Sequence, residues 1–487
     1  MVPGRVLAPA SDTGWAPARP GWDRAEIAFA VGAFVLLCIA VLTAAPFLVE
    51  PDDWAYRASI VAMTQGHFLT LTTAQAHALG TQLAVGHWGR PGLAPPPIPQ
   101  WVQLTGGRWI SEKDPGYPFL AAPFQALGII RLAPLFYAGL GCLGLFFGAR
   151  RWLGRFGGAA AVGLFCSSGA ALLFAWRDYM PTFTDASLIA AGTGALVWAV
   201  LAADAATRWR TAAGLAGFAA LEAAVFVRYT DAVVLFCAVV AVVAVVAVLV
   251  AWRLRMIPAS APGWWLGSVV VAGAGIATFD DVVYGGPLKS GYRPGEITFS
   301  LGAIPPNLRL MPAHLISAMP MLVLGAAALA WIIARQLSWS RAGGERAAFA
   351  RRDLAVGLAL AASWCGVWGL YAAYTWTAQP GASTLQVARF YVPATGAIAL
   401  LGAWLVVRVP ARASLAAVAT AAVVLVMFGL GMWSFSAMRG QPRGGTHHGG
   451  GVEQVIGEGA GPRGSPGVRH AIADRGTARS LPASYKV

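Results

Sequence analysis

The chain has 487 residues, of which 57% are hydrophobic and 11% charged. Soluble domains carry about 25% charged residues, so this composition excludes a soluble globular protein and predicts a polytopic membrane protein. The net charge of +14 comes mostly from loop arginines and a basic tail, with no basic stripe interleaved with aromatic residues. Nucleic acid is therefore not an expected partner.

Membrane-spanning helices are predicted from the apolar runs, because a span needs about 20 mostly apolar residues. We expect an all-α membrane protein with about eleven such helices. The stretch 117–147 could hold one helix or two. The runs lie at 26–49, 133–149, 157–175, 183–203, 211–227, 232–252, 264–279, 311–334, 354–376, 390–407 and 413–435.

Arginine positions predict the orientation of the chain. Short loops between alternate runs are dense in arginine, which assigns them to the cytoplasm by the positive-inside rule. The long loops 50–132 and 280–310 and the shorter 376–389 then face outward, and we expect the chemistry there. The arginines concerned are Arg150, Arg151, Arg155, Arg208, Arg210, Arg253, Arg255, Arg335, Arg341, Arg346, Arg351, Arg352, Arg408 and Arg412.

Three parts of the chain are predicted from these patterns. Residues 1–25 form a cytoplasmic segment, and residues 26–436 form the membrane domain, in which the outer loop 50–132 carries the candidate site. The tail, 437–487, is rich in Gly, Arg, Pro and Ser and cannot bury enough apolar surface to fold, so we expect it to be disordered. The first apolar run lacks a convincing cleavage site and is expected to stay as an anchor.

An acidic pair opens the first outer loop, in "PDDWAYRASIVAMTQGHF". Its apolar positions predict a short interfacial helix from Asp52 to Gly66, with Asp52 and Asp53 in the first turn. Two interpretations of the pair are equally favoured. The acids cap the helix, with Asp53 and Arg57 as a surface ion pair, or one of them is a catalytic acid.

A lysine at the end of the same loop, in "SEKDPGYPFLAAPF", favours the second interpretation. Lys113 lies between Glu112 and Asp114, before a rigid turn. A cation at the membrane interface suits a phosphate group, whereas the alternative is a lysine solvated among lipid headgroups. The chain strongly prefers arginine, and its three lysines are Lys113, Lys289 and Lys486, so we favour a specific role for Lys113.

Two later outer segments carry similar residues. "TFDDVVYGGPLKSGY" contains the acids Asp280 and Asp281, and "ARFYVPATGAIALL" contains Arg389 at the outer end of a late span. Arg228, in "FVRYTDAV", has a similar position. Each arginine taken singly is explained at least as well by contact with lipid headgroups. We favour a structural role for the Asp280–Asp281 pair.

Four of these stretches together resemble a known family, the GT-C membrane glycosyltransferases, in the bacterial group of aminoarabinose transferases and relatives of protein O-mannosyltransferases. They are "DDWAYRASIV", "SEKDPGYPFLAAPF", "YGGPLKSGY" and "ARFYVPATGAIALL". The aminoarabinose transferases have Asp-Glu in place of Asp52-Asp53, and Lys-Pro-Pro in place of Lys113-Asp114-Pro115. These differences concern the sugar and the acceptor more than the reaction type.

The resemblance implies transfer of a sugar from a polyprenyl-phosphate donor to an acceptor hydroxyl. We expect this at the outer face of the plasma membrane, among membrane lipids, with a cell-envelope glycan, lipid or protein as acceptor. Asp52 or Asp53 is the expected general base, and Lys113, Arg57 and Arg389 are expected to bind the donor phosphate in a pocket that Tyr391 lines. Further pocket candidates are Glu112, Asp114, Tyr117, Lys289 and Tyr292.

A divalent cation, Mg²⁺ or Mn²⁺, is an open alternative for the second acid, with Asp53 as its candidate ligand.

Other functions predict other patterns. A transporter or flippase of a lipid-linked intermediate predicts ionisable groups at mid-depth in several helices, but Glu222 is the only clear mid-membrane acid. A non-enzymatic assembly subunit leaves the clustering of Asp, Lys and Tyr in the outer loops unexplained.

Overall fold

A computed structural model of the protein describes residues 23–44, 51–83, 97–104, 106–251, 261–287, 289–292, 295, 297–339, 344–378, 384–408 and 413–439. All of these residues belong to one compact unit, Met1–Gly444. Residues 1–22 of the N-terminal segment, and the tail from 440 on, lie outside the described residues. The last helix runs to Arg439 and so passes the expected boundary at residue 436.

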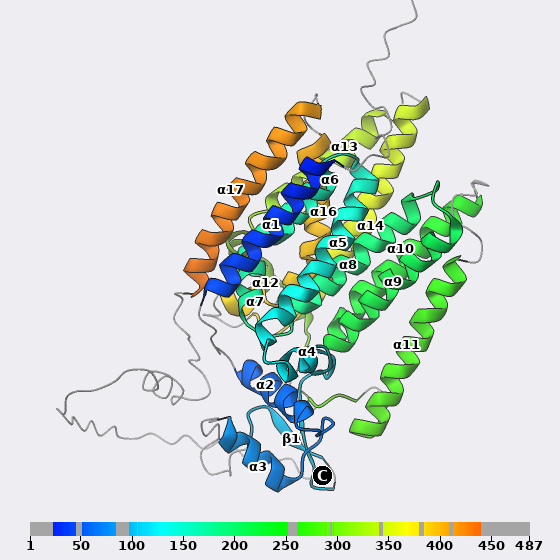
Figure 1. Cartoon of the computed structure of the whole chain (residues 1–487). Helices are drawn as coiled ribbons and strands as arrows, with labels where there is room; N and C mark the ends of the chain where they lie inside the picture. The colour runs from blue at the N-terminus through cyan, green and yellow to red at the C-terminus, as the bar shows by residue number, and fades with distance from the viewer. Residues whose placement is uncertain are drawn as a thin grey trace, which may run out of the picture. The chain divides into compact units, whose positions relative to one another are not determined.

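Long apolar helices dominate the described part of the chain, so the expected all-α membrane fold is confirmed (Figure 1). Seven helices are long and apolar enough to span a membrane by themselves. They are α1 (Arg24–Thr43), α5 (Ala133–Leu153), α8 (Thr182–Leu201), α9 (Thr207–Val227), α11 (Ala261–Tyr284), α14 (Gly344–Ala372) and α17 (Ala413–Arg439).

Two bent helix pairs bring the number of spans to nine if each pair is counted as one span. Helices α6 (Gly157–Ser167) and α7 (Gly169–Trp176) meet at 61°, and α12 (Ile304–Ala318) and α13 (Leu322–Trp339) meet at 108°. The second break lies at Pro320, which cannot continue a helix. Helices α10 (Ala232–Ala251) and α16 (Thr395–Arg408) are also apolar, but the apolar stretches described for them are too short to be counted as spans. All eleven predicted runs are thus helical, but seven to nine spans are established among the described residues, and the count of eleven is not.

Small residues let the central helices pack closely. A Cβ atom added to Gly144 of α5 would lie 2.5 Å from the carbonyl oxygen of Ala191, and one added to Gly194 of α8 would lie 2.1 Å from that of Gly144. Such contacts between backbones are how membrane helices gain packing energy without a hydrophobic driving force. Helix α8 is therefore held tightly against α5, and its first turn is a firm support for the site described below.

A small subdomain lies at one end of the helical bundle (Figure 1). The expected helix from Asp52 to Gly66 is present as α2 (Pro51–Thr64). It packs with Leu71, Leu79, Ile98 and Trp101 in a small core of its own. The subdomain also contains α3 (Thr73–Gln82), the antiparallel strands β1 (Trp101–Gln103) and β2 (Trp109–Ser111), and α4 (Gly116–Ala126), followed by the short turn η1 (Ile130–Leu132).

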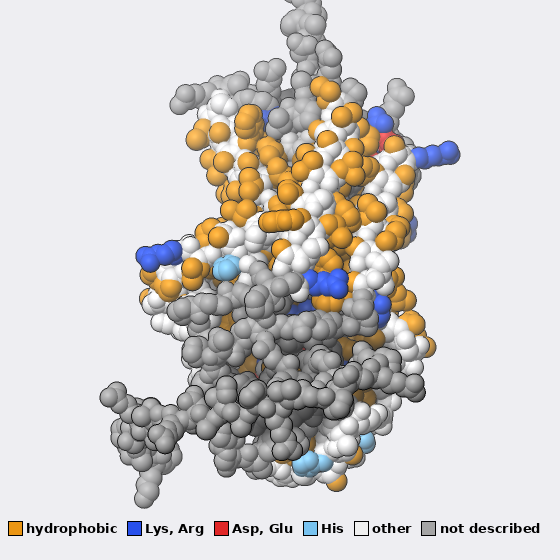
Figure 2. All heavy atoms as spheres, turned by 90° about the vertical axis from the view of Figure 1, so that its left-hand side faces the viewer, with side chains coloured by type: hydrophobic (Ala, Val, Ile, Leu, Met, Phe, Trp, Pro, Cys, Tyr) orange, Lys and Arg blue, Asp and Glu red, His pale blue; other side chains and the backbone are white. Residues whose placement is uncertain are grey.

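Apolar side chains cover the flank of the bundle that Figure 2 shows. Exposed hydrophobic residues on α1 and α17 include Val31, Ile39, Leu425 and Trp433. A soluble monomer rarely exposes so large an apolar surface. The chain is a multi-pass membrane protein.

Candidate active site

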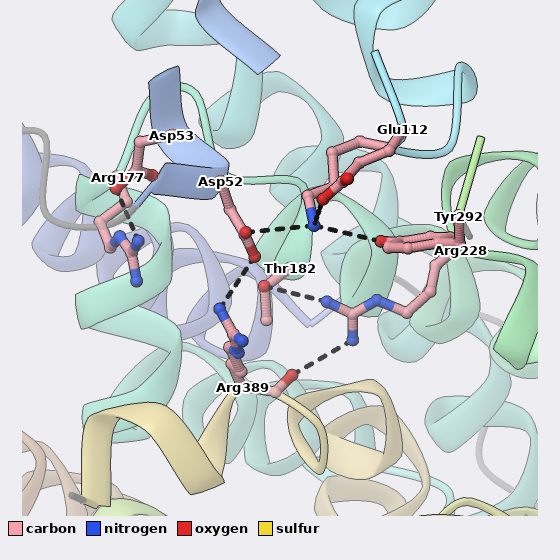
Figure 3. Close-up of polar contacts among 9 residues, drawn as sticks. Asp52, Asp53, Glu112, Arg177, Thr182, Arg228, Tyr292 and Arg389 are labelled. Carbon is pink, nitrogen blue, oxygen red and sulfur yellow. Dashed lines mark hydrogen bonds and ion pairs between the residues drawn. The ribbon is translucent and has the colours of Figure 1, made fainter. Parts of the chain in front are cut away.

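Asp52 lies between two cations where the subdomain meets the bundle (Figure 3). Lys113 Nζ is 3.2 Å from one carboxylate oxygen and Arg389 Nη1 is 2.9 Å from the other. Asp52 comes from the first turn of α2, Lys113 from the loop between β2 and α4, and Arg389 from the turn between α15 (Thr384–Ala388) and η4 (Val392–Ala394). Three segments far apart in the sequence therefore build one charged cluster.

Two further residues surround the ammonium group of Lys113. Glu112 Oε1 lies 3.2 Å from Nζ, and Tyr292 approaches with its hydroxyl at 3.4 Å and its ring centroid at 4.8 Å (Figure 3). Tyr292 reaches this position because Gly291 has no side chain, since a Cβ there would lie 2.4 Å from Glu112 Cα. Asp52, Glu112, Lys113, Tyr292 and Arg389 are called the loop cluster below.

Aromatic rings hold Arg389 in the loop cluster. Its guanidinium group lies 4.9 Å from the ring centroid of Trp376 and 4.7 Å from that of Phe390, distances at which cation–π attraction contributes about 0.5–2 kcal/mol. The side chains of Asp52 and Arg389 keep 16% and 12% of their surface exposed. The cluster is therefore mostly desolvated yet open enough to meet a ligand.

The charges of the loop cluster stabilise one another. Burial alone would raise the pKa of Asp52, but the neighbouring Lys113 and Arg389 hold this pKa well below its usual range. Burial would lower the pKa of Lys113, but Asp52 and Glu112 raise it above its ordinary value. Both groups therefore stay charged at neutral pH, and two cations are fixed in place before any ligand arrives.

Asp53 belongs to a different pair. Its carboxylate is 2.6 Å from Arg177 Nη2, and both side chains are fully buried (Figure 3). The adjacent Asp178 accepts a hydrogen bond at its carbonyl oxygen from the hydroxyl of Tyr117, and burial raises the pKa of its carboxyl group to about 6. The two acids of the sequence motif thus face different environments: Asp52 pairs with Lys113 and Arg389, and Asp53 pairs with the buried Arg177.

A divalent cation does not fit Asp53 in this arrangement. The guanidinium group of Arg177 occupies the position beside the carboxylate that a metal ion would take. Among the described residues, no three His, Cys, Asp or Glu side chains gather closely enough to hold a metal ion. The chemistry derived below runs through no metal.

Asp114 lies behind the loop cluster. One carboxylate oxygen accepts a hydrogen bond from the backbone N–H of Tyr229 at 3.3 Å. Burial raises the pKa of Asp114 to about 7, against the opposing effects of this hydrogen bond and of Arg228 and Lys113. At neutral pH this carboxyl group is therefore divided between its two protonation states.

Four other predicted site residues lie outside the loop cluster. Arg57 stacks near Trp54 and Tyr179, at 5.3 and 5.8 Å from their ring centroids. The remaining three make contacts of their own: Tyr117 donates to the Asp178 carbonyl oxygen, Lys289 donates to the Gly285 carbonyl oxygen at 3.0 Å, and Tyr391 contacts Met311 Sδ at 2.9 Å. Their predicted roles stay predictions.

Sequence reasoning missed Arg177, Asp178 and Thr182. All three lie in "WRDYMPTFTDAS", which joins two apolar runs and to which no role was assigned. An arginine next to an aspartate at the end of a span was the available signal, because ionisable residues at that depth usually have a specific partner.

No family model matches the chain, and no curated protein matches it. Among solved structures, the chain is similar to the apo oligosaccharyltransferase of Archaeoglobus fulgidus, with 12% identity, a TM-score of 0.47 and coverage of 84% of this chain and 56% of that one. It is also similar to ArnT from Cupriavidus metallidurans bound to undecaprenyl phosphate (14% identity, TM-score 0.48, 85% and 69% covered) and in the apo state (15%, 0.44, 79% and 60%).

The chain spans between 56% and 69% of the length of these three structures. Activity, substrates and partners of this chain are matters of proposal.

Proposed function

We propose that the protein transfers a sugar from a polyprenyl-phosphate donor to an acceptor hydroxyl at the outer face of the plasma membrane. The observation that carries the proposal is the loop cluster, in which Lys113 Nζ and Arg389 Nη1 converge on the two oxygens of Asp52. Two fixed cations at the end of a membrane helix bundle suit a phosphate group whose lipid chain lies in the bilayer.

The proposed reaction forms one bond and breaks one. The acceptor oxygen attacks the anomeric carbon, and the bond from that carbon to the phosphate oxygen breaks, so that its electron pair stays on the phosphate. Lys113 and Arg389 stabilise the charge that develops there. Removing one such electrostatic donor typically costs a factor of about 10²–10³ in rate.

Asp52 is the better candidate for the general base. Its carboxylate is partly accessible, whereas Asp53 is fully buried against Arg177. In the empty site both cations bind Asp52, and an incoming phosphate competes for them. Binding of the donor therefore frees the carboxylate and raises its pKa, which prepares it to take the proton of the acceptor hydroxyl.

The distribution of arginines supports the proposed orientation. The predicted cytoplasmic residues Arg150, Arg352 and Arg408 lie at the ends of α5, α14 and α16 that are remote from α2 and α4 (Figure 1). With this end in the cytoplasm, the loop cluster faces the extracytoplasmic side, where a lipid-linked donor exposes its headgroup. The plasma membrane of a bacterium is the proposed location.

The test is an in vitro transfer assay with purified protein, a panel of polyprenyl-phosphate sugars and an envelope extract. The matched pair of variants is Asp52→Asn in the loop cluster and Asp281→Asn on the exposed outer end of α11. We expect label transfer with wild type and Asp281→Asn and none with Asp52→Asn. Movement of the donor between leaflets of a vesicle, without transfer from any donor, would instead identify a flippase.

A further inference from the structure

Arg228 holds the backbone of Arg389. It lies between α9 and the turn η2 (Tyr229–Asp231), with 12% of its side chain exposed. Its Nη1 donates to the carbonyl oxygen of Arg389 at 3.2 Å, and its Nη2 donates to the hydroxyl oxygen of Thr182 at 3.2 Å (Figure 3). The guanidinium fork thus joins the first turn of α8 to the turn that carries Arg389.

Two buried carboxyl groups also lie near the guanidinium group of Arg228. Asp185 Oδ2 is 3.9 Å from Arg228 Nη1, and Asp231 interacts electrostatically with both Asp185 and Arg228. Both acids are at most 1% exposed, and their side chains interact with each other. Acids buried in this way need a counter-charge, and Arg228 supplies one.

The segments that anchor Arg228 are held more firmly than the turn that carries Arg389. Thr182 and Asp185 lie on α8, which packs tightly on α5, and the backbone N–H of Asp231 bonds to the Arg228 carbonyl oxygen at 2.9 Å. Arg389 lies in a short turn between a five-residue helix and a three-residue one. A short turn of this kind keeps its position only through contacts with its surroundings.

We propose that Arg228, anchored by Asp185, Asp231 and Thr182, is a positioning residue that holds Arg389 at the place where the donor phosphate binds. The inference rests on the proposed function, because it assigns the ligand of Arg389. Arg228 itself contacts the backbone of Arg389 and acts on the ligand only through it. A phosphate-binding cation is most effective when it is fixed before the ligand arrives.

A double-mutant cycle tests this proposal. The measurement is the affinity of the purified, folded protein for a short-chain polyprenyl phosphate in detergent. Arg228→Gln is compared alone and combined with Arg389→Gln. We expect Arg228→Gln alone to weaken binding on the order of tenfold, and to have no further effect when Arg389 is already replaced.

The control is Arg210→Gln. Arg210 is another buried arginine of α9 that donates to a carbonyl oxygen, that of Ala199 at 3.0 Å, but at the opposite end of the helix. It should leave affinity unchanged in both backgrounds. Thr182→Val, which removes one acceptor of the fork, should weaken binding by a few-fold and serves as the second probe if Arg228→Gln does not fold.

The outcomes separate this inference from the proposed function. Two results would overturn the positioning role alone, provided that the wild type binds polyprenyl phosphate. In the first, Arg228→Gln and Thr182→Val both bind with wild-type affinity. In the second, adding Arg228→Gln to Arg389→Gln lowers the affinity further. A wild-type protein that fails to bind polyprenyl phosphate would overturn the proposed function and the positioning role together.

Discussion

Two acid-centred clusters lie at opposite ends of the bundle and differ in how their charge is satisfied. In the loop cluster, each oxygen of Asp52 faces one cation, Lys113 or Arg389. In the second cluster, Asp353 of α14 accepts hydrogen bonds from the indole N–H groups of Trp152 at 3.0 Å and Trp404 at 2.9 Å. Both clusters tie distant segments together, but the oxygens of Asp52 pair with cations at 2.9–3.2 Å, whereas those of Asp353 accept from neutral indole groups and the nearest arginine, Arg335, is 3.9 Å away.

The supporting elements differ too. Asp353, Trp152 and Trp404 all come from long membrane helices, α14, α5 and α16, and Arg352 and Arg408 both donate to the Trp152 carbonyl oxygen at the end of α5. Neutral donors that fill both oxygens of a buried carboxylate leave a ligand nothing to displace. We therefore expect the Asp353 cluster to contribute to stability, in contrast to the ligand binding proposed for the loop cluster.

Replacement of Lys113 should separate ligand binding from stability most strongly. Lys113→Ala removes a fixed cation from the developing phosphate charge, so we expect transfer to fall by about 10²–10³-fold. The melting temperature should change little by comparison. The matched control is Lys289→Ala, since Lys289 is exposed and the described hydrogen bond of its ammonium group goes to the Gly285 carbonyl oxygen. Equal losses of transfer in both variants would remove the assigned role of Lys113.

Replacement of Asp353 should have the opposite profile. Asp353→Ala leaves two indole N–H groups without an acceptor and Arg335, 3.9 Å away, without its carboxylate. We expect a loss of about 3 kcal/mol in the free energy of unfolding, with unchanged turnover per folded molecule. Asp204→Ala, at an exposed acid paired with Arg151, should change stability by less than about 0.5 kcal/mol. Thermal unfolding in detergent, with activity normalised to folded protein, measures both.

A pH dependence should distinguish Asp114 from the rest of the loop region. Burial raises its pKa to about 7, above the unfolded value of about 4, so the folded state holds a proton that the unfolded chain has lost. This contribution to stability is fully present below about pH 4 and is lost as the pH rises through about 7.

Wild type should therefore lose up to about 2 kcal/mol relative to Asp114→Asn between pH 5 and pH 7. Thermal unfolding of both proteins across this range measures the difference in slope. Asp281→Asn, at an exposed acid, should follow the wild-type slope. Parallel curves for wild type and Asp114→Asn would mean that Asp114 ionises as an ordinary carboxyl group.

Local sequence patterns were sufficient for the helices and for the members of the loop cluster. The helix after the acidic pair, and the positions of Lys113 and Arg389 at span ends, follow from composition and turn chemistry over a few residues. The bends at Ser168 and Pro320 were not predicted, because an apolar run carries no periodicity that tells a straight span from a broken one. Each bent pair lies within one predicted run, so the bends change the shape of those spans and not the predicted number.

Pairing between distant segments was beyond the same patterns. Asp52 and Arg389 are 337 positions apart, and their contact depends on how α2 docks on the bundle. The surroundings of Tyr391 illustrate the limit: it lies two residues after Arg389, and its contacts with Trp368 and Met311 could not be read from that spacing. The division of Asp52 and Asp53 between two partners follows from helix geometry, since adjacent residues point about 100° apart.

The smallest expected effect tests the competition proposed for Asp52. Asp52→Asn removes the charge that neutralises Lys113 and Arg389 in the empty site, so the product, polyprenyl phosphate, should bind more tightly, on the order of tenfold or about 1.4 kcal/mol. Transfer should be lost in the same variant, because an amide cannot accept the proton. Titration calorimetry in detergent with Asp281→Asn as control measures the gain. Weaker binding in Asp52→Asn would mean that Asp52 orients the two cations instead of competing with the phosphate for them, and the base would then have to be sought elsewhere.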